Sequence, residues 1–215
     1  MCVNYAPLQR QVLRDIFGIE PPAGDWKTEA WPDYPAPIIR ATSDGAREAV
    51  LGTFSMVPRS MIPPGVRYYP TANARMETIG KISSFARYWK AGQLCLAPAT
   101  AFYEPNWETG KAVRWKLGLP GDEPFAIAGL WRDWPNGAVS FAMPTLNADN
   151  DPLMSRFHKP GDEIRSVVIL PRESWDDWLG CRDPELARSF LRLYPSGAMV
   201  AEAAPVPPRT GNVAT

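Results

Sequence analysis

The sequence has little cysteine and almost no histidine, and each shortage excludes a class of protein. Its 215 residues include three cysteines, with no Cys-x-x-Cys spacing, and one histidine. An odd number of widely spaced cysteines argues against a disulfide framework and against a zinc ribbon. A single histidine excludes a site with several imidazole ligands in one chain, so we expect no metal ion and no other cofactor.

The chain also lacks an excess of either charge and any long apolar run. Its 23 basic and 23 acidic side chains balance, so nucleic-acid binding would need a local basic patch. No apolar stretch approaches the roughly 20 residues that span a bilayer, and the first residues lack the features of a signal peptide. We therefore expect a cytoplasmic protein without membrane contact and, since nothing suggests an obligate partner, a monomer.

The sequence does contain enough apolar material for one core, because 45% of it is hydrophobic. Helices are predicted over 7–18, 84–90, 173–179 and 184–193, and Asp183 is expected to cap the last one. Residues 18–37 are expected to form an ordered loop. The runs typical of strands lie at 48–54, 93–97, 113–119, 125–131, 139–143 and 166–170. This pattern predicts a single domain of the mainly antiparallel α+β class.

Cys2 is the position with the greatest chemical consequence. Its small side chain permits removal of Met1, which would leave an α-amine and a thiol on one residue. An α-amine has a pKa of about 8, against about 10.4 for lysine, so at neutral pH it attacks aldehydes far more readily. The neighbouring thiol can then close a five-membered thiazolidine ring. An incidental small residue is the alternative, and Cys95 and Cys181 are expected to serve only in packing.

Three other segments combine residue types that suit proton transfer or phosphate binding. Asn73 could orient an amine and Arg75 could hold a phosphate, although a capping asparagine beside a solvated arginine fits as well. Glu104 follows an apolar strand and two aromatic residues, surroundings that raise a carboxyl pKa, or it is an ordinary strand-end acid. His158 is either a general acid–base or a structural side chain.

Taken together, these segments resemble the SOS response-associated peptidase (SRAP) family. The resemblance runs in order from residue 2 to about residue 171. It is carried by Met-Cys2, Asn73-Ala-Arg75-x-Glu77-Thr, Cys-Leu-x-Pro-Ala-x-x-Phe-Tyr-Glu104, Ala128-Gly-Leu-Trp131 and His158 before Val-Val-Ile-Leu-Pro. It implies a compact domain over 2–203 around a barrel-like sheet with short flanking helices, and a flexible tail over 204–215.

The resemblance also implies a function, namely self-removal of Met1 followed by covalent capture of abasic sites in single-stranded DNA. By this resemblance Cys2 is the crosslinking nucleophile and Asn73 positions its amine. Glu104 is the proton-transfer residue, and His158 is the acid that assists opening of the deoxyribose ring. Arg75 is a phosphate contact.

Further DNA contacts follow from segments in which this chain departs from the family pattern. In Thr-Phe54-Ser-Met56-Val-Pro, a variant of the family's Trp-Gly-Leu-Ile-Pro, Phe54 and Met56 are expected to stack on or wedge between bases. The usual Cys-Gly-Arg start is replaced by Cys-Val-Asn4, which removes one basic contact. The loop after the histidine is longer and more acidic than usual, and Lys159 or Arg165 is expected to replace its missing arginine.

Two other functions stay open at this level. A peptidase or amidohydrolase could use the Cys2 thiolate against an amide, with the Cys2 α-amine or His158 as base. A non-catalytic binding module would use the same motifs only as scaffold. Reaction with an aldehyde, turnover of an amide or retention of Met1 would distinguish the three.

Overall fold

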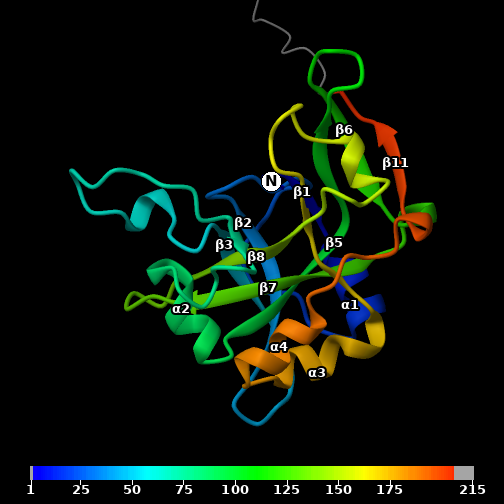
Figure 1. Cartoon of the computed structure of the whole chain (residues 1–215). Helices are drawn as coiled ribbons and strands as arrows, with labels where there is room; N and C mark the ends of the chain where they lie inside the picture. Colours follow the sequence, from blue (N-terminus) through cyan, green and yellow to red (C-terminus); the bar gives the residue numbers. More distant parts are fainter. Residues whose placement is uncertain (1, 206–215) are drawn as a thin grey trace, which may run out of the picture.

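Five strands join edge to edge into a closed ring at the centre of the molecule (Figure 1). The computed structural model describes residues 2–205. The strands of the ring are β7 (Phe125–Asp133), β8 (Val139–Asn147), β3 (Arg47–Phe54), β2 (Pro35–Ala41) and β5 (Leu94–Asn106), and β5 pairs again with β7. All of these pairings are antiparallel except the short β3–β8 contact, which makes the ring uneven. The single compact α+β domain with a mainly antiparallel, barrel-like sheet is confirmed.

Short strands extend this ring and carry the ends of the chain onto it. They are β1 (Tyr5–Pro7) and β6 (Val113–Gly118) on β5, β11 (Val200–Ala203) on β6, β4 (Asn73–Arg75) and β9 (Arg165–Val167) on β8, and β10 (Ile169–Leu170) on β7. The pairing of β1 with β5 matters most for the site, because it lays the first residues of the chain on the strand that contains Glu104.

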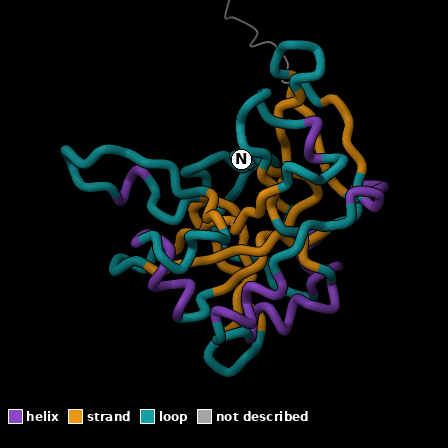
Figure 2. The backbone as a smooth tube through the Cα atoms, in the orientation of Figure 1, coloured by secondary structure: helices purple, strands orange, loops and turns teal. Residues whose placement is uncertain are grey.

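The four α-helices of residues 2–205 lie in the lower part of the molecule in the view of Figure 2, away from the amino terminus. They are α1 (Arg10–Phe17), α2 (Ser83–Lys90), α3 (Trp175–Gly180) and α4 (Pro184–Phe190). The glycine after α1 has a φ of 64°, a left-handed conformation that ends the helix where the sequence predicts. Asp183 caps α4 as expected, since its Oδ1 accepts the Glu185 N–H at 2.8 Å. Within residues 2–205, every helix is too short or too polar to cross a bilayer.

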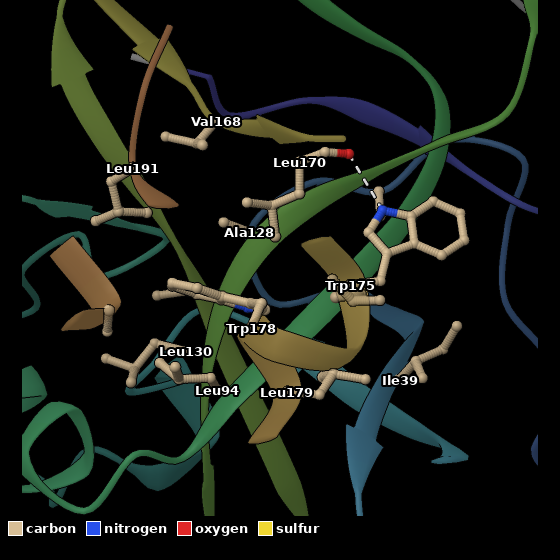
Figure 3. Close-up of a cluster of buried hydrophobic side chains, with 14 of the residues drawn as sticks. Ile39, Leu94, Ala128, Leu130, Val168, Leu170, Trp175, Trp178, Leu179 and Leu191 are labelled. Atoms are coloured by element: carbon tan, nitrogen blue, oxygen red, sulfur yellow. Dashed lines mark hydrogen bonds between the residues drawn. The ribbon is translucent and has the colours of Figure 1, made fainter. Parts of the chain in front are cut away.

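Helix α3 is attached to the strands through its two buried tryptophans (Figure 3). Trp178 Nε1 donates to the Cys95 carbonyl at 2.9 Å, and Trp175 Nε1 donates to the Leu170 carbonyl at 3.1 Å. Each indole therefore adds a large apolar area to the core while its polar N–H stays paired. Cys181 is buried in the same apolar cluster as these tryptophans and Cys95 is buried in a second cluster, as expected for packing residues.

The sequence patterns miss β1, β2, β4 and β11. Three of these have only three or four residues, too few for an alternation to stand out. β2 contains Pro35 and Pro37, which normally argue against a strand. They are tolerated because only Ile39 and Arg40 pair with a second neighbour, β5. The predicted tail over 204–215 lies outside the described residues, apart from its first two.

Candidate active site

Cys2 lies against the end of β5 because the chain that follows it pairs with that strand. The Tyr103 N–H donates to the Asn4 carbonyl at 2.9 Å. In an antiparallel pair, each step back from Asn4 corresponds to one step forward along β5. Cys2 is thereby brought alongside Glu104 and the residue after it.

Asn4 anchors this start of the chain from within the protein. It is buried, and its Oδ1 accepts hydrogen bonds from Arg114 Nη2 at 2.7 Å and Nε at 3.1 Å. Its Nδ2 donates to the Ala30 carbonyl at 3.2 Å. Arg114 is itself held by an ion pair with Glu29 at 2.7 Å. Asn4, which stands where the resemblance leads us to expect an arginine, therefore anchors the start of the chain and with it Cys2.

Asn73 contacts Cys2 from another part of the sheet. β4 runs parallel to β8 and pairs Asn73 with Met143. From there Asn73 Nδ2 donates to the Cys2 carbonyl at 2.6 Å. The Asn73 Oδ1 is buried and has no hydrogen-bond partner within residues 2–205. This side chain can therefore accept a further hydrogen bond next to Cys2.

Glu104 and His158 form a buried pair beside Cys2. Their side chains are almost inaccessible, and His158 Nε2 lies 3.6 Å from Glu104 Oε2. Burial raises the pKa of Glu104 to about 7, while the positive charge of the amino terminus opposes that rise. Burial, and then the same positive charge, lowers the pKa of His158 to about 4. At neutral pH the carboxyl group therefore exchanges a proton readily, whereas the imidazole is neutral.

The Cys2 thiol is also neutral at physiological pH. It is buried, and its Sγ lies 3.4 Å from the Asn4 carbonyl oxygen. Burial raises its pKa to about 12, and the negative charge of Glu104 adds to this rise. A thiolate therefore has little population in this environment.

Two of the five predicted DNA contacts lie on the surface. Arg75 is half-exposed, with its Nη1 2.5 Å from Glu163 Oε2. Lys159 is exposed and lines, together with His158, a surface cavity of about 350 Å³. Both cations are thus accessible to a ligand near the site.

The prediction that Phe54 and Met56 contact bases is wrong. Both side chains are completely buried. The Phe54 ring packs between Tyr5 and Phe141, with both centroid distances at 5.3 Å. An apolar residue at a strand end has the same sequence pattern whether it points inward or outward, so the sequence could not exclude this outcome.

The prediction that Arg165 replaces a missing phosphate contact is also wrong. Its side chain is only 1% exposed. Its guanidinium binds both carboxylate oxygens of Glu77, at 3.1 and 2.9 Å, and Glu163 Oε1 at 2.7 Å. It also donates to the Thr145 carbonyl. These contacts make Arg165 a structural cation that ties β9 to the segment after β4.

The sequence patterns do not single out Asn106 or Trp31. Asn106 is buried two residues beyond Glu104 in β5. The strand alternation would have placed it on the same face as Glu104. Trp31 is 38% exposed, and the residue before it pairs with Tyr5 of β1. An isolated tryptophan in a proline-rich loop carries no comparable signal.

Comparison with known proteins identifies the chain's relatives. A crystal structure of a protein from Bordetella bronchiseptica is 36% identical, covers 95% of this chain and 100% of its own, and superposes with a TM-score of 0.84. Two further crystal structures share the fold at 19% identity each. A protein from Bacteroides thetaiotaomicron has a TM-score of 0.73 and covers 94% of this chain and 91% of its own. A phage-related protein from B. bronchiseptica has a TM-score of 0.68 and covers 94% of each chain. No curated protein matches the chain. The family model for SOS response associated peptidases matches residues 1–213. This chain therefore belongs to the SOS response associated peptidase (SRAP) family.

Proposed function

We propose that the protein captures abasic sites in single-stranded DNA covalently through Cys2 after Met1 has been removed. The observation that carries the proposal is the meeting of three distant polar side chains at Cys2. Asn73 binds the Cys2 carbonyl, and the Glu104–His158 pair is buried beside it. Their convergence in an otherwise apolar region is expected of a reactive centre.

The chemistry begins with the ring-opened sugar, whose C1′ is an aldehyde. The Cys2 amine adds to this carbon, and the hydroxyl group leaves as water to give an imine. The Cys2 thiol then adds to the imine carbon, and its proton passes to the nitrogen as the C–S bond closes the thiazolidine ring. Glu104, with a pKa of about 7, can give and take protons in these steps. The Asn73 Oδ1 can accept an N–H of the amine and so direct its lone pair.

His158 has a different role from the charged acid that the family resemblance suggests. With a pKa of about 4 it is neutral at physiological pH. In the proposed mechanism its neutral ring donates one hydrogen bond and accepts another, and so links the sugar to Glu104. Hydrolysis of the Met1–Cys2 bond would likewise use Glu104 for proton transfer.

The alternative, a peptidase that attacks external amides with the Cys2 thiolate, has less support. It requires an ionised sulfur, but the Cys2 pKa is about 12 and the neighbouring Glu104 disfavours a second negative charge. The imine route needs only a neutral amine and a neutral thiol. The electrostatics of the site therefore favour aldehyde capture.

For the DNA strand we propose contacts that replace those excluded by burial. Arg75 and Lys159 are accessible cations for phosphates. Trp31 is a candidate for stacking on a base, because it is partly exposed and lies on the segment paired with β1. With so few accessible cations and no net charge, binding should be weak and sensitive to salt.

The test is a denaturing-gel crosslinking assay with single-stranded DNA that carries one abasic site. The parent protein is expected to give an adduct whose mass is that of both components minus one water, with Met1 absent. Cys2→Ala and Cys2→Ser both keep the α-amine and lose the thiol, so neither should give the denaturation-resistant adduct. After removal of Met1, each should give only a reversible imine that borohydride can trap. A tetrahydrofuran analogue, which cannot form an aldehyde, is the matched DNA control.

Two results would refute the proposal. One is equal adduct formation by Cys2→Ala and the parent. The other is a mature protein that retains Met1 and yet forms the adduct. Turnover of an amide substrate together with no reaction toward the abasic strand would instead support the thiolate peptidase.

A further inference from the structure

Asn106 is a buried polar residue that the proposed chemistry does not use. It is the last residue of β5 and is only 2% exposed. Residues two apart on a strand point to the same face, so its side chain projects on the same side of the sheet as that of Glu104. Burial of an amide is costly unless its polar atoms are hydrogen-bonded, so its contacts define its role.

The Asn106 side chain is hydrogen-bonded both to the segment that leads to His158 and to Glu108. Its Nδ2 donates to the Arg156 carbonyl at 3.1 Å and to Glu108 Oε2 at 3.0 Å. Its Oδ1 accepts the Glu108 N–H at 3.0 Å. The backbone of Asn106 also forms a β-bridge with Phe157. The side chain therefore holds Arg156 and the main chain holds Phe157, which are the two residues just before the histidine.

Arg156 makes further contacts with Glu108 and with Trp115 next to this amide. Arg156 Nε and Nη2 bind the two carboxylate oxygens of Glu108 at 2.9 and 3.3 Å. The Arg156 guanidinium lies over the Trp115 ring, 5.0 Å from its centre. Hydrogen bonds from Arg156 and then Asn106 lower the pKa of Glu108, so this carboxylate stays ionised. We call Asn106, Glu108 and Arg156 the Asn106 clamp.

His158 needs such support because its backbone is strained. Its φ is 78°, a left-handed value that is unfavourable for a residue with a side chain and is often found at functional sites. Its N–H donates to the Pro105 carbonyl at 2.9 Å, so the histidine is fastened between Glu104 and Asn106 along β5. The Asn106 clamp holds the residues just before the histidine and so supports this unfavourable conformation.

We infer that Asn106 is a positioning residue, which sets the imidazole of His158 against the Glu104 carboxyl group through the Asn106 clamp. What the positioned pair accomplishes rests on the proposed function. The positioning itself does not, because it concerns only where the imidazole lies and how far it is excluded from water.

The single histidine of the chain provides a direct readout, since its ring gives one set of NMR signals that can be titrated. In the parent protein His158 should titrate near pH 4. In Asn106→Ala the released segment should admit water, and the pKa of His158 should rise by about one unit or more toward 6.5. The amino terminus, Asp149 and Asp162, which also act on this ring, are unchanged in the variant.

Three further variants separate positioning from general stability. Asn106→Asp keeps the shape and the acceptor but loses both donated bonds, and should behave like Asn106→Ala. Glu108→Ala removes one partner from an exposed position, so it should fold normally and raise the His158 pKa by a smaller amount. Asn136→Ala, in the distant β7–β8 turn, is the matched control and should leave the titration unchanged.

The Asn106 and Glu108 variants should slow adduct formation about tenfold to a hundredfold, without weakening binding to the tetrahydrofuran analogue, whereas Asn136→Ala should leave the rate unchanged. The inference is overturned if Asn106→Ala or Glu108→Ala leaves both the His158 titration and the rate at the parent values. Should the parent form no adduct at all, the proposed function fails, and the histidine titration still decides the inference about Asn106.

Discussion

Replacing Glu104 with glutamine should stabilise the protein at neutral pH and have little such effect in acid. Burial raises the pKa of this carboxyl group from 4.5 to about 7. The folded state holds the proton of Glu104 more tightly than the unfolded state. The contribution of this proton to the free energy of unfolding is therefore fully present below about pH 4.5 and is lost as the pH rises through about 7. At about 1.4 kcal/mol per pH unit, the loss above pH 7 amounts to about 3 kcal/mol. Glutamine resembles the neutral acid and avoids this loss.

Urea unfolding of the parent and of Glu104→Gln at pH 5, 6, 7 and 8 measures the difference. The free energy of unfolding of the variant should exceed that of the parent by an amount that grows toward about 3 kcal/mol across this series. His158 contributes its own dependence below pH 6.5, but it is present in both proteins. Glu123→Gln, at an exposed position, should show no such trend. A difference that is constant with pH would mean that Glu104 is not desolvated, and the argument for its role as a neutral acid would fail.

Three further predictions concern the anchors and the DNA contacts. Asn4→Ala leaves Arg114 without its buried acceptor and should lower the free energy of unfolding by about 2 kcal/mol in urea titrations; a loss below 0.5 kcal/mol would contradict its anchoring role. Phe54→Ala should cost about 3 to 5 kcal/mol of stability yet leave single-strand affinity unchanged in fluorescence anisotropy, whereas a selective loss of affinity would restore the base-contact hypothesis. Lys159→Ala and Arg75→Ala should each reduce the slope of log affinity against log salt by about one, and an unchanged slope would exclude that side chain as a phosphate contact.

The elements of the fold were largely predictable because their patterns are local. Alternation and apolar runs locate the long strands. A glycine marks the C-terminal end of α1, and a capping aspartate marks the start of α4. The sequence did not predict β2, because prolines are permitted in a strand only where one of its sides is unpaired. Whether a side is unpaired depends on the neighbouring strands. The closure of the ring through β5 and β7 is likewise a property of tertiary pairing.

For the site, the sequence could suggest which residue types suit the chemistry, but not the direction in which each points. Cys2, Asn73, Glu104 and His158 lie far apart in the chain, and the structure brings them together. Arg165 is a residue type that suits a phosphate contact, yet its guanidinium is bound by Glu163, two residues before it, and by Glu77, which is distant in the sequence. No local pattern reports the distant partner.

The desolvation that sets the properties of Glu104 and His158 also bears on the proposed nucleophile. Burial lowers the pKa of an amine, just as it lowers that of an imidazole and raises that of a carboxyl group. An α-amine at Cys2 has an ordinary pKa of about 8, and burial would favour its neutral form. An ionised Glu104 would oppose this effect, but Glu104 is itself protonated for part of the time. Burial thus favours the neutral amine and neutral thiol that imine formation and ring closure require. In the proposed mechanism, the reaction with an aldehyde therefore depends on burial at one end of the sheet, whereas the overall charge of zero bears only on how tightly DNA binds.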